Sequence, residues 1–213
     1  MEQNVSMKIN ELPSPTWNWL KVNETPIKWS NKIEPCEIAA EGDAVSAETE
    51  QLSDIETGAG READAIFATE NTAKYQILAD NAGQDKTVRL HISGKKDAHT
   101  AGCVEIVAKE NSTLTVVMDS RVAPDATKEE DSTAEASLAV RVRMKVESGA
   151  SVRLVQVQMP QEHETLLSDI GGNLIGEGAK VEYIQLFLGK GNLYSGCRMD
   201  LNGKESNLAT ETG

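Results

Sequence analysis

The chain has 213 residues and is poor in aromatic side chains, which make up only 4% of it. A core must therefore be filled by Val, Leu, Ile and Met, a composition that suits stacked aliphatic side chains. No apolar run approaches the ~18 residues that a membrane-spanning helix needs. The opening MEQNVSMKIN also lacks the apolar stretch of a signal peptide. We therefore expect a cytoplasmic protein.

Cysteine is scarce as well, and the three thiols are far apart in the sequence. Their odd number disfavours a disulfide framework and fits a reducing cytoplasm. Iron–sulfur ligation needs clustered thiolates, and the chain contains no C-x-x-C. Cys36 is interpreted as a free thiol and Cys103 as a small core residue. Cys197 is the best of three weak candidates for a metal ligand.

Basic residues are too few for a nucleic-acid footprint, since the formal net charge is −13. Residues 34–70 contain eleven Asp and Glu against the single Arg61, which gives −10 and leaves −3 for the rest. This segment also has many small residues and few large apolar ones. We expect a solvated, mobile connection with room for a helical turn or two. The alternative is a docking segment for a basic partner surface.

What the chain does have is an internal repeat at a spacing of 29 residues. Gly149–Val157 (GASVRLVQV) aligns with Gly178–Leu186 (GAKVEYIQL), and both copies consist of β-forming residues. Such a period is typical of a solenoid, in which each unit buries its face against the next. The pattern predicts a right-handed parallel β-helix (a β-solenoid) from about Thr87 onward, with Val152 and Val181 stacked in adjacent coils.

Adjacent apolar residues interrupt the alternation within each copy, at Leu154-Val155 and at Tyr183-Ile184. Because neighbours in a strand face opposite sides, this slip predicts a bend or a buried corner between two short strands. A looser third copy, Asn111–Met118, begins 38 residues before the copy at Gly149. The polar stretch 124–134 (PDATKEEDSTA) accounts for the nine extra residues as a surface insertion.

Three segments follow: a Trp- and Pro-rich, partly helical region (1–33), the acidic connection (34–70) and the β-helix core (71–213). In the first, Trp17, Trp19 and Trp29 are expected to cluster with Leu12 and Leu20. Within the core, Arg141, Arg143 and Lys145 are expected to form a solvated outer face. The strand signals lie at Thr87–Ser93, Cys103–Ala108, Leu114–Met118, Leu138–Val146, Val152–Met159, Val181–Leu188 and Leu193–Met199.

The remaining candidate groups have simple structural interpretations. His91 and His99 are spaced like the two ends of a hairpin, and without nearby carboxylate or Cys ligands they are interpreted as structural. His163 falls in a polar turn, and Gly171-Gly172-Asn173 is interpreted as another turn. Gly189-Lys190-Gly191 lacks the rest of a P-loop pattern. No catalytic, cofactor-binding or metal residue is assigned.

The run Leu12-Pro13-Ser14-Pro15-Thr16-Trp17-Asn18-Trp19-Leu20-Lys21 resembles the start of SufB/SufD iron–sulfur cluster assembly proteins, which begin with Leu-Pro and a Trp-containing segment. The Gly-Ala-x-Val steps at Gly149 and Gly178 look like the β-helical core of that family. No long region precedes the Leu-Pro motif, so the chain looks more like the SufD type.

The resemblance implies a non-enzymatic scaffold that works with the SufC ABC-type ATPase and a SufB-type paralogue. It also implies that the ATPase-binding helices and the ligands for the cluster lie beyond Gly213. The chain is therefore expected to be the N-terminal part of a longer protein, with no cofactor of its own, and an iron–sulfur cluster is implied only for the full complex. The exposed edge of its last strands is expected to recruit another copy, which would give a homo-oligomer.

Two other classes remain open. A carbohydrate-active β-helix would carry carboxylates and aromatics along a groove, and the scarcity of aromatics in the coils argues against it. A self-assembling structural β-solenoid is the other, although the Trp-rich start favours a specific partner. Polysaccharide hydrolysis would support the first, and filaments of the full-length protein would support the second.

Overall fold

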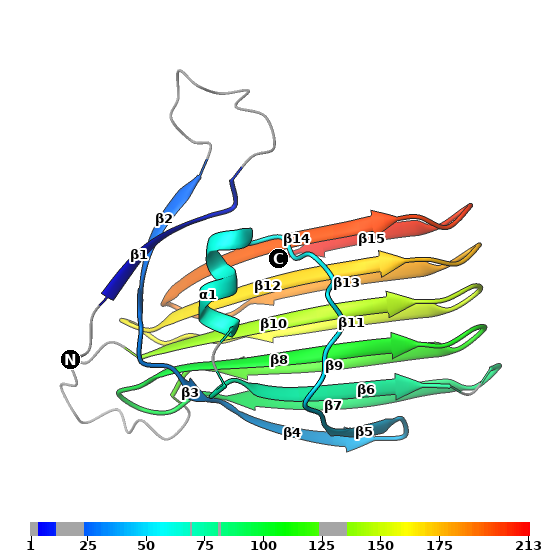
Figure 1. The fold of residues 1–213 in the computed structure, drawn as a ribbon. Helices are drawn as coiled ribbons and strands as arrows, with labels where there is room; N and C mark the ends of the chain where they lie inside the picture. The colour runs from blue at the N-terminus through cyan, green and yellow to red at the C-terminus, as the bar shows by residue number, and fades with distance from the viewer. Residues whose placement is uncertain (1–3, 12–23, 69, 81, 124–135) are drawn as a thin grey trace.

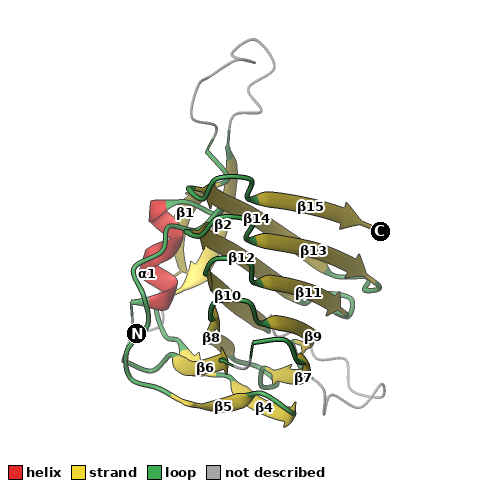
Figure 2. Cartoon of the chain, turned by 90° about the vertical axis from the view of Figure 1, so that its right-hand side faces the viewer, coloured by secondary structure: helices red, strands yellow, loops and turns green. Residues whose placement is uncertain are grey.

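The computed structural model describes residues 4–11, 24–68, 70–80, 82–123 and 136–213. They form a mainly β structure in which strands stack into a parallel solenoid of two facing sheets (Figures 1 and 2). Successive strand pairs, from β6–β7 to β14–β15, each contribute one strand to either sheet. The chain therefore winds back and forth between the sheets as it climbs the solenoid.

We call the sheet that faces the viewer in Figure 1 the front sheet. Its strand order is β14-β12-β10-β8-β6-β5, and β3 also pairs with β8. Its bounds are β3 (Glu34–Pro35), β5 (Val45–Glu48), β6 (Ala73–Ala79), β8 (His99–Ala108), β10 (Ser137–Val146), β12 (Thr165–Leu174) and β14 (Asn192–Leu201).

The other sheet, here called the back sheet, has the order β15-β13-β11-β9-β7-β4. Its bounds are β4 (Glu37–Gly42), β7 (Asp85–Ser93), β9 (Thr113–Arg121), β11 (Ser151–Gln158), β13 (Lys180–Phe187) and β15 (Asn207–Thr212).

Parallel pairing stacks identical or similar aliphatic residues between the sheets. Val152 lies in register with Val181 on one side and with Leu114 on the other, and all three are buried. The 29-residue repeat thus predicts the stacking of Val152 on Val181 correctly. The register of β9 against β11 confirms the 38-residue offset, so the extra residues lie between Arg121 and Ser137.

All seven predicted strands are present, but the coils begin earlier than predicted and the strands run straighter. Both the short β3 and β6 lie before Thr87 and pair parallel with β8. The predicted corner at Leu154-Val155 is wrong, because β11 is one continuous strand. Leu154 and Gln156 face the interior, while Val155 lies half-exposed on the outer face. The two adjacent apolar residues therefore mark a strand that is apolar on both faces.

The predicted turn at Gly171-Gly172-Asn173 is also wrong, since these residues lie inside β12. Each glycine makes room for a neighbour. A Cβ on Gly171 would clash with the backbone carbonyl of Glu56, which crosses the outer face there. A Cβ on Gly172 would collide with the side chain of Met199, which fills the interior at that point. The glycines thus serve close approach within a strand.

The described part of residues 1–33 is a β-hairpin of β1 (Asn4–Ile9) and β2 (Thr25–Ser30). Trp29 and Ile9 on its inner side are buried against Ile66 and Leu167, on the outer face of the front sheet. No helix occurs among the described residues of this region. Trp17, Trp19, Leu12 and Leu20 lie outside the described residues, so the predicted tryptophan cluster stays a prediction.

Residues 34–70 are not the solvated connection that their charge suggested. β4 and β5 pair antiparallel with β7 and β6 and close the lower end of the solenoid in Figure 1.

Residues 51–67, which we call the strap, then cross the outer face of the front sheet. The strap ends in η1 (Arg61–Ala63) and α1 (Asp64–Phe67). Five buried apolar residues anchor it, namely Ile55, Ala59, Ala63, Ile66 and Phe67. The division into three segments stays a prediction.

Candidate functional site

The outer face of the front sheet carries a buried ion pair beneath the strap. Arg141 of β10 and Asp169 of β12 are neighbours in register. Arg141 Nε donates to Asp169 Oδ2 at 2.8 Å, and Nη2 lies 2.8 Å from the same oxygen. The side chain of Arg141 is 3% exposed and that of Asp169 is 0% exposed. The predicted solvated basic row is therefore wrong at Arg141.

The strap supplies the remaining partners of this pair. Asp169 accepts hydrogen bonds from the Thr57 hydroxyl at 2.6 Å and from the Ala59 backbone N–H at 2.8 Å. Asp64 lies 2.8 Å from Arg141 Nη2, and the guanidinium stands 4.1 Å from the centre of the Phe67 ring. Such a paired and hydrogen-bonded charge is what burial in a protein requires. The pair therefore fixes the strap to the sheet.

A second polar group lies one row further along the same face. Glu105 accepts from the Ser53 backbone N–H at 2.9 Å and from Gln76 Nε2 at 2.6 Å. Arg143 donates to the Ser53 carbonyl at 2.8 Å. Burial alone would raise the pKa of Glu105, but these hydrogen bonds and the charge of Arg143 lower it. Both ends of the strap are thus held by charged side chains of the sheet.

Inside the solenoid, a polar cluster interrupts the aliphatic core. Gln156 Oε1 accepts from Ser168 at 3.0 Å and from the Tyr183 hydroxyl at 2.8 Å. In the next coil, Gln185 donates to Gln158 Oε1 at 2.7 Å and to Ser195 at 3.0 Å. The Nε2 of Gln156 is buried and has no hydrogen-bond partner among the described residues. Sequence reasoning missed this cluster because a corner at Leu154-Val155 would turn Val155 and Val157 inward and Gln156 and Gln158 outward.

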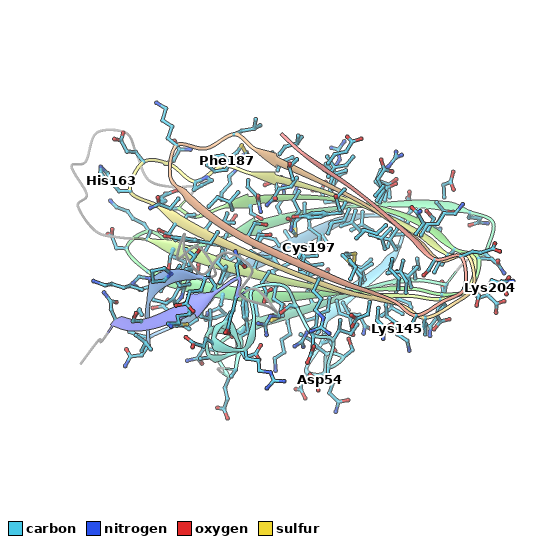
Figure 3. The ribbon with its side chains drawn as sticks, turned by 90° about the horizontal axis from the view of Figure 1, so that it is seen from above. Asp54, Lys145, His163, Phe187, Cys197 and Lys204 are labelled. Atoms are coloured by element: carbon cyan, nitrogen blue, oxygen red, sulfur yellow. The ribbon has the colours of Figure 1, made fainter. Side chains whose placement is uncertain are left out.

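The three cysteines do not meet. Cys36 and Cys103 are buried, and burial raises the pKa of Cys36 to about 12 and that of Cys103 to about 11. Cys103 lies on the outer face under the hairpin and strap, which confirms its assignment as a small buried residue. Cys197 lies in β14, between the sheets at the upper end of the solenoid (Figure 3). Its side chain is exposed, and desolvation raises its pKa to about 11.

The histidines are dispersed too. His91 of β7 pairs with Asp119 on the back sheet at 2.5 Å, whereas His99 of β8 contacts Ser137 at 2.6 Å on the front sheet. β7 and β8 belong to different sheets, so the predicted hairpin between these histidines is wrong. His163 is exposed in a turn, as predicted. Among the residues the structure describes, no three His, Cys, Asp or Glu could jointly hold a metal.

Two further features are open to solvent. A cavity of about 1110 Å³ beside the lower end is lined by Glu37, Glu48, Glu50 and Glu70, with Lys74 among them. At the upper end, β14 and β15 each pair with one strand within the described ranges, and Leu201 is 49% exposed. Neither feature resembles an enclosed catalytic pocket. Extended sheet faces and edges dominate the surface, and such surfaces suit protein–protein contacts.

Comparison with known proteins gives this architecture a context. The family model for the SUF system FeS cluster assembly, SufBD core domain, matches residues 92–212. This range begins within β7 and includes every later strand. The chain belongs to the SufB/SufD family. The match links it to iron–sulfur cluster assembly by the SUF system. It covers the Gly-Ala steps at Gly149 and Gly178, whereas the Trp-rich start lies outside the matched residues.

Other comparisons add no relative to this SufB/SufD core domain. A search of curated proteins and a search of solved structures each gave no significant match. Within the described part of the chain, no helix is long and apolar enough to cross a membrane.

Proposed function

We propose that this SufB/SufD chain is a scaffold subunit of the SUF assembly complex, which works with a SufC-type ATPase and a SufB-type paralogue in the cytoplasm. The match of the SufBD core domain to residues 92–212 carries the proposal. The solenoid supports it, because its surfaces are long sheet faces and edges on which other subunits can be held. The proposal assigns no catalytic residue, and the iron–sulfur cluster is the cargo of the complex.

The chemistry of the described residues further limits the role. The three thiols lie on separate elements, and burial or desolvation raises the pKa of each, so that all are protonated near neutral pH. A cluster requires several thiolates or imidazoles that converge on one point. We therefore propose that these 213 residues alone hold no cluster and bind the ATPase only weakly. Both activities would require further subunits or further sequence.

The test is co-purification followed by reconstitution. The chain, and any longer form found in its genome, are each mixed with the SufC-type ATPase and the SufB-type paralogue from the same genome. The longer form should retain the ATPase, and the complex with the paralogue should acquire a visible iron–sulfur absorption. Binding of an oxygen-sensitive cluster by the 213 residues alone, lost on Cys197→Ser, would refute the limited role proposed here.

A further inference from the structure

The cavity at the lower end of the solenoid opens onto the hydrophobic core. The strands β3, β4, β5 and β6 meet at this end (Figures 1 and 2), and residues near their ends line a cavity of about 1110 Å³. Four of the lining residues form what we call the floor, namely Cys36, Ile38, Ala73 and Tyr75. Cys36 is buried within the interior core, and the other three are half-buried and pack against that core. An apolar side chain placed in the cavity would therefore extend the core of the solenoid.

The outer lining of the cavity is strongly acidic. It consists of four exposed glutamates, which we call the rim: Glu37, Glu48, Glu50 and Glu70. All four belong to the acidic segment 34–70. Lys74 is the one basic residue in the described lining, so four carboxylates and one ammonium give the cavity a charge of −3.

The rim carboxylates are not neutralised by neighbouring basic side chains. Within the described ranges, none of the four forms an ion pair. The ammonium of Lys74 donates to the backbone carbonyl of Glu50 at 3.4 Å and not to a carboxylate. By contrast, Glu34, which is not part of the lining, pairs with Lys95 at 3.3 Å. The rim therefore holds uncompensated negative charge next to apolar surface.

The pairing of β5 with β6 sets one rim carboxylate beside the floor. Glu48 lies directly opposite Tyr75 in this antiparallel pair, so the two side chains share one face of the sheet. Tyr75 packs against the interior core, and that face is therefore the inner one. Next to Glu48, the Thr49 hydroxyl donates to the Gln51 carbonyl at 3.1 Å and accepts from the Gln51 backbone N–H at 3.3 Å. This turn fixes the place of Glu50, and a molecule that covers Tyr75 meets the Glu48 carboxylate.

We propose that the cavity binds a short basic segment of a partner protein. A large apolar side chain of that segment packs on the floor, and Lys or Arg residues on either side of it contact the rim. Charge complementarity favours a basic partner, and an apolar side chain in a pocket is the usual anchor of such contacts. A metal ion does not fit, because no group of three ligands among the described residues could hold one. A second copy of the chain is disfavoured by its net charge of −13.

Fluorescence polarisation with labelled peptides tests the chemistry of the occupant. The peptides GKRLKRG, GKRSKRG and GEELEEG differ in the apolar anchor or in the sign of the charge. The leucine peptide should bind the 213-residue chain, the serine peptide should bind at least about fivefold more weakly, and the acidic peptide should not bind. Added salt should weaken binding of the leucine peptide because the rim is exposed. No binding of the leucine peptide at about 1 mM, or equal binding of the leucine and serine peptides, would overturn the proposal.

Charge reversal at the rim tests the location. Glu48→Lys combined with Glu70→Lys changes the charge of the lining from −3 to +1 and should weaken binding of the leucine peptide about tenfold or more. Glu162→Lys combined with Glu211→Lys changes the charge of the whole chain equally, at exposed positions outside the lining, and should weaken binding less than about twofold. Equal effects of the two variants would show non-specific attraction and refute the site. Carbodiimide coupling of the peptide, read by mass spectrometry, should label the rim glutamates, and coupling only at other carboxylates would refute it as well.

Discussion

Replacing Asp169 by alanine tests whether the strap is held by the buried ion pair. The substitution removes the acceptor for Arg141 Nε, for the Thr57 hydroxyl and for the Ala59 backbone N–H. It leaves the guanidinium of Arg141 buried beside the Phe67 ring. Breaking a buried pair by removing one partner costs about 3–5 kcal/mol. Because Asp64 stays 2.8 Å from Arg141, we expect the lower value, about 3 kcal/mol.

Urea and thermal denaturation measure this loss. For a chain of this length, each kcal/mol shifts Tm by roughly 2–4 °C, so the variant should melt roughly 6–12 °C lower. Hydrogen exchange should rise first in residues 51–67, because the strap loses its anchor while the solenoid keeps its core. Exchange that rises uniformly through β8, β10 and β12 would show that the pair stabilises the sheet and not the strap.

Two matched variants separate the charge from the packing. Lys204→Ala removes an ion pair with Glu177 in which both side chains are mostly exposed, and it should cost under ~0.5 kcal/mol. Replacing the buried pair together, as Arg141→Met with Asp169→Leu, should be much less harmful than Asp169→Ala alone, because no charge is left unpaired. If Asp169→Ala costs no more than Lys204→Ala, the anchoring role is refuted.

Three further predictions concern the core and the thiols. Val152→Asp, at a fully buried position in the stack with Val181, should cost about 3–5 kcal/mol in urea denaturation, whereas Val155→Asp on the outer face should cost much less. Gln156→Leu leaves the hydroxyls of Ser168 and Tyr183 without their acceptor and should lower the free energy of unfolding by about 1–3 kcal/mol. Gln158→Leu serves as the comparison. The thiol of Cys36 has a pKa raised from 9.0 to about 12, so its stabilising contribution is complete below pH 9 and is lost as pH rises toward 12. Cys36→Ala should flatten the decline of stability in that range, and an unchanged alkaline profile would contradict the burial of this thiol.

The sequence predicts the solenoid well because stacking repeats one local pattern. Val152 and Val181 occupy equivalent places in successive coils, and their spacing is visible without any long-range information. Gly171 and Gly172 show the limit of that method. They resemble a turn in isolation, and only the crossing backbone of Glu56 and the side chain of Met199 explain them.

The sequence did not predict that the outer face of the front sheet is covered, for a related reason. Arg141 alternates with apolar residues as an exposed residue would, and nothing near it in the sequence predicts a cover. The strap that covers it comes from more than 70 residues earlier, and its own acidity suggested solvent. The adjacent apolar residues Leu154 and Val155 did contain a usable signal. They indicate a strand that is apolar on both faces.

The outer faces of the two sheets differ in the free energy that is lost when their charged groups are removed from water. On the front sheet, Arg141 and Asp169 must lose water when the strap binds, and only their mutual pairing and the strap's hydrogen bonds compensate for it. On the back sheet, Arg153 and Glu182 pair with each other at the surface, and the exposed Glu211 lies in register with Ile184 on the same face. These charges keep their water, so they need no buried partner. Docking of the strap on the front sheet should therefore depend on its charged and hydrogen-bonding residues.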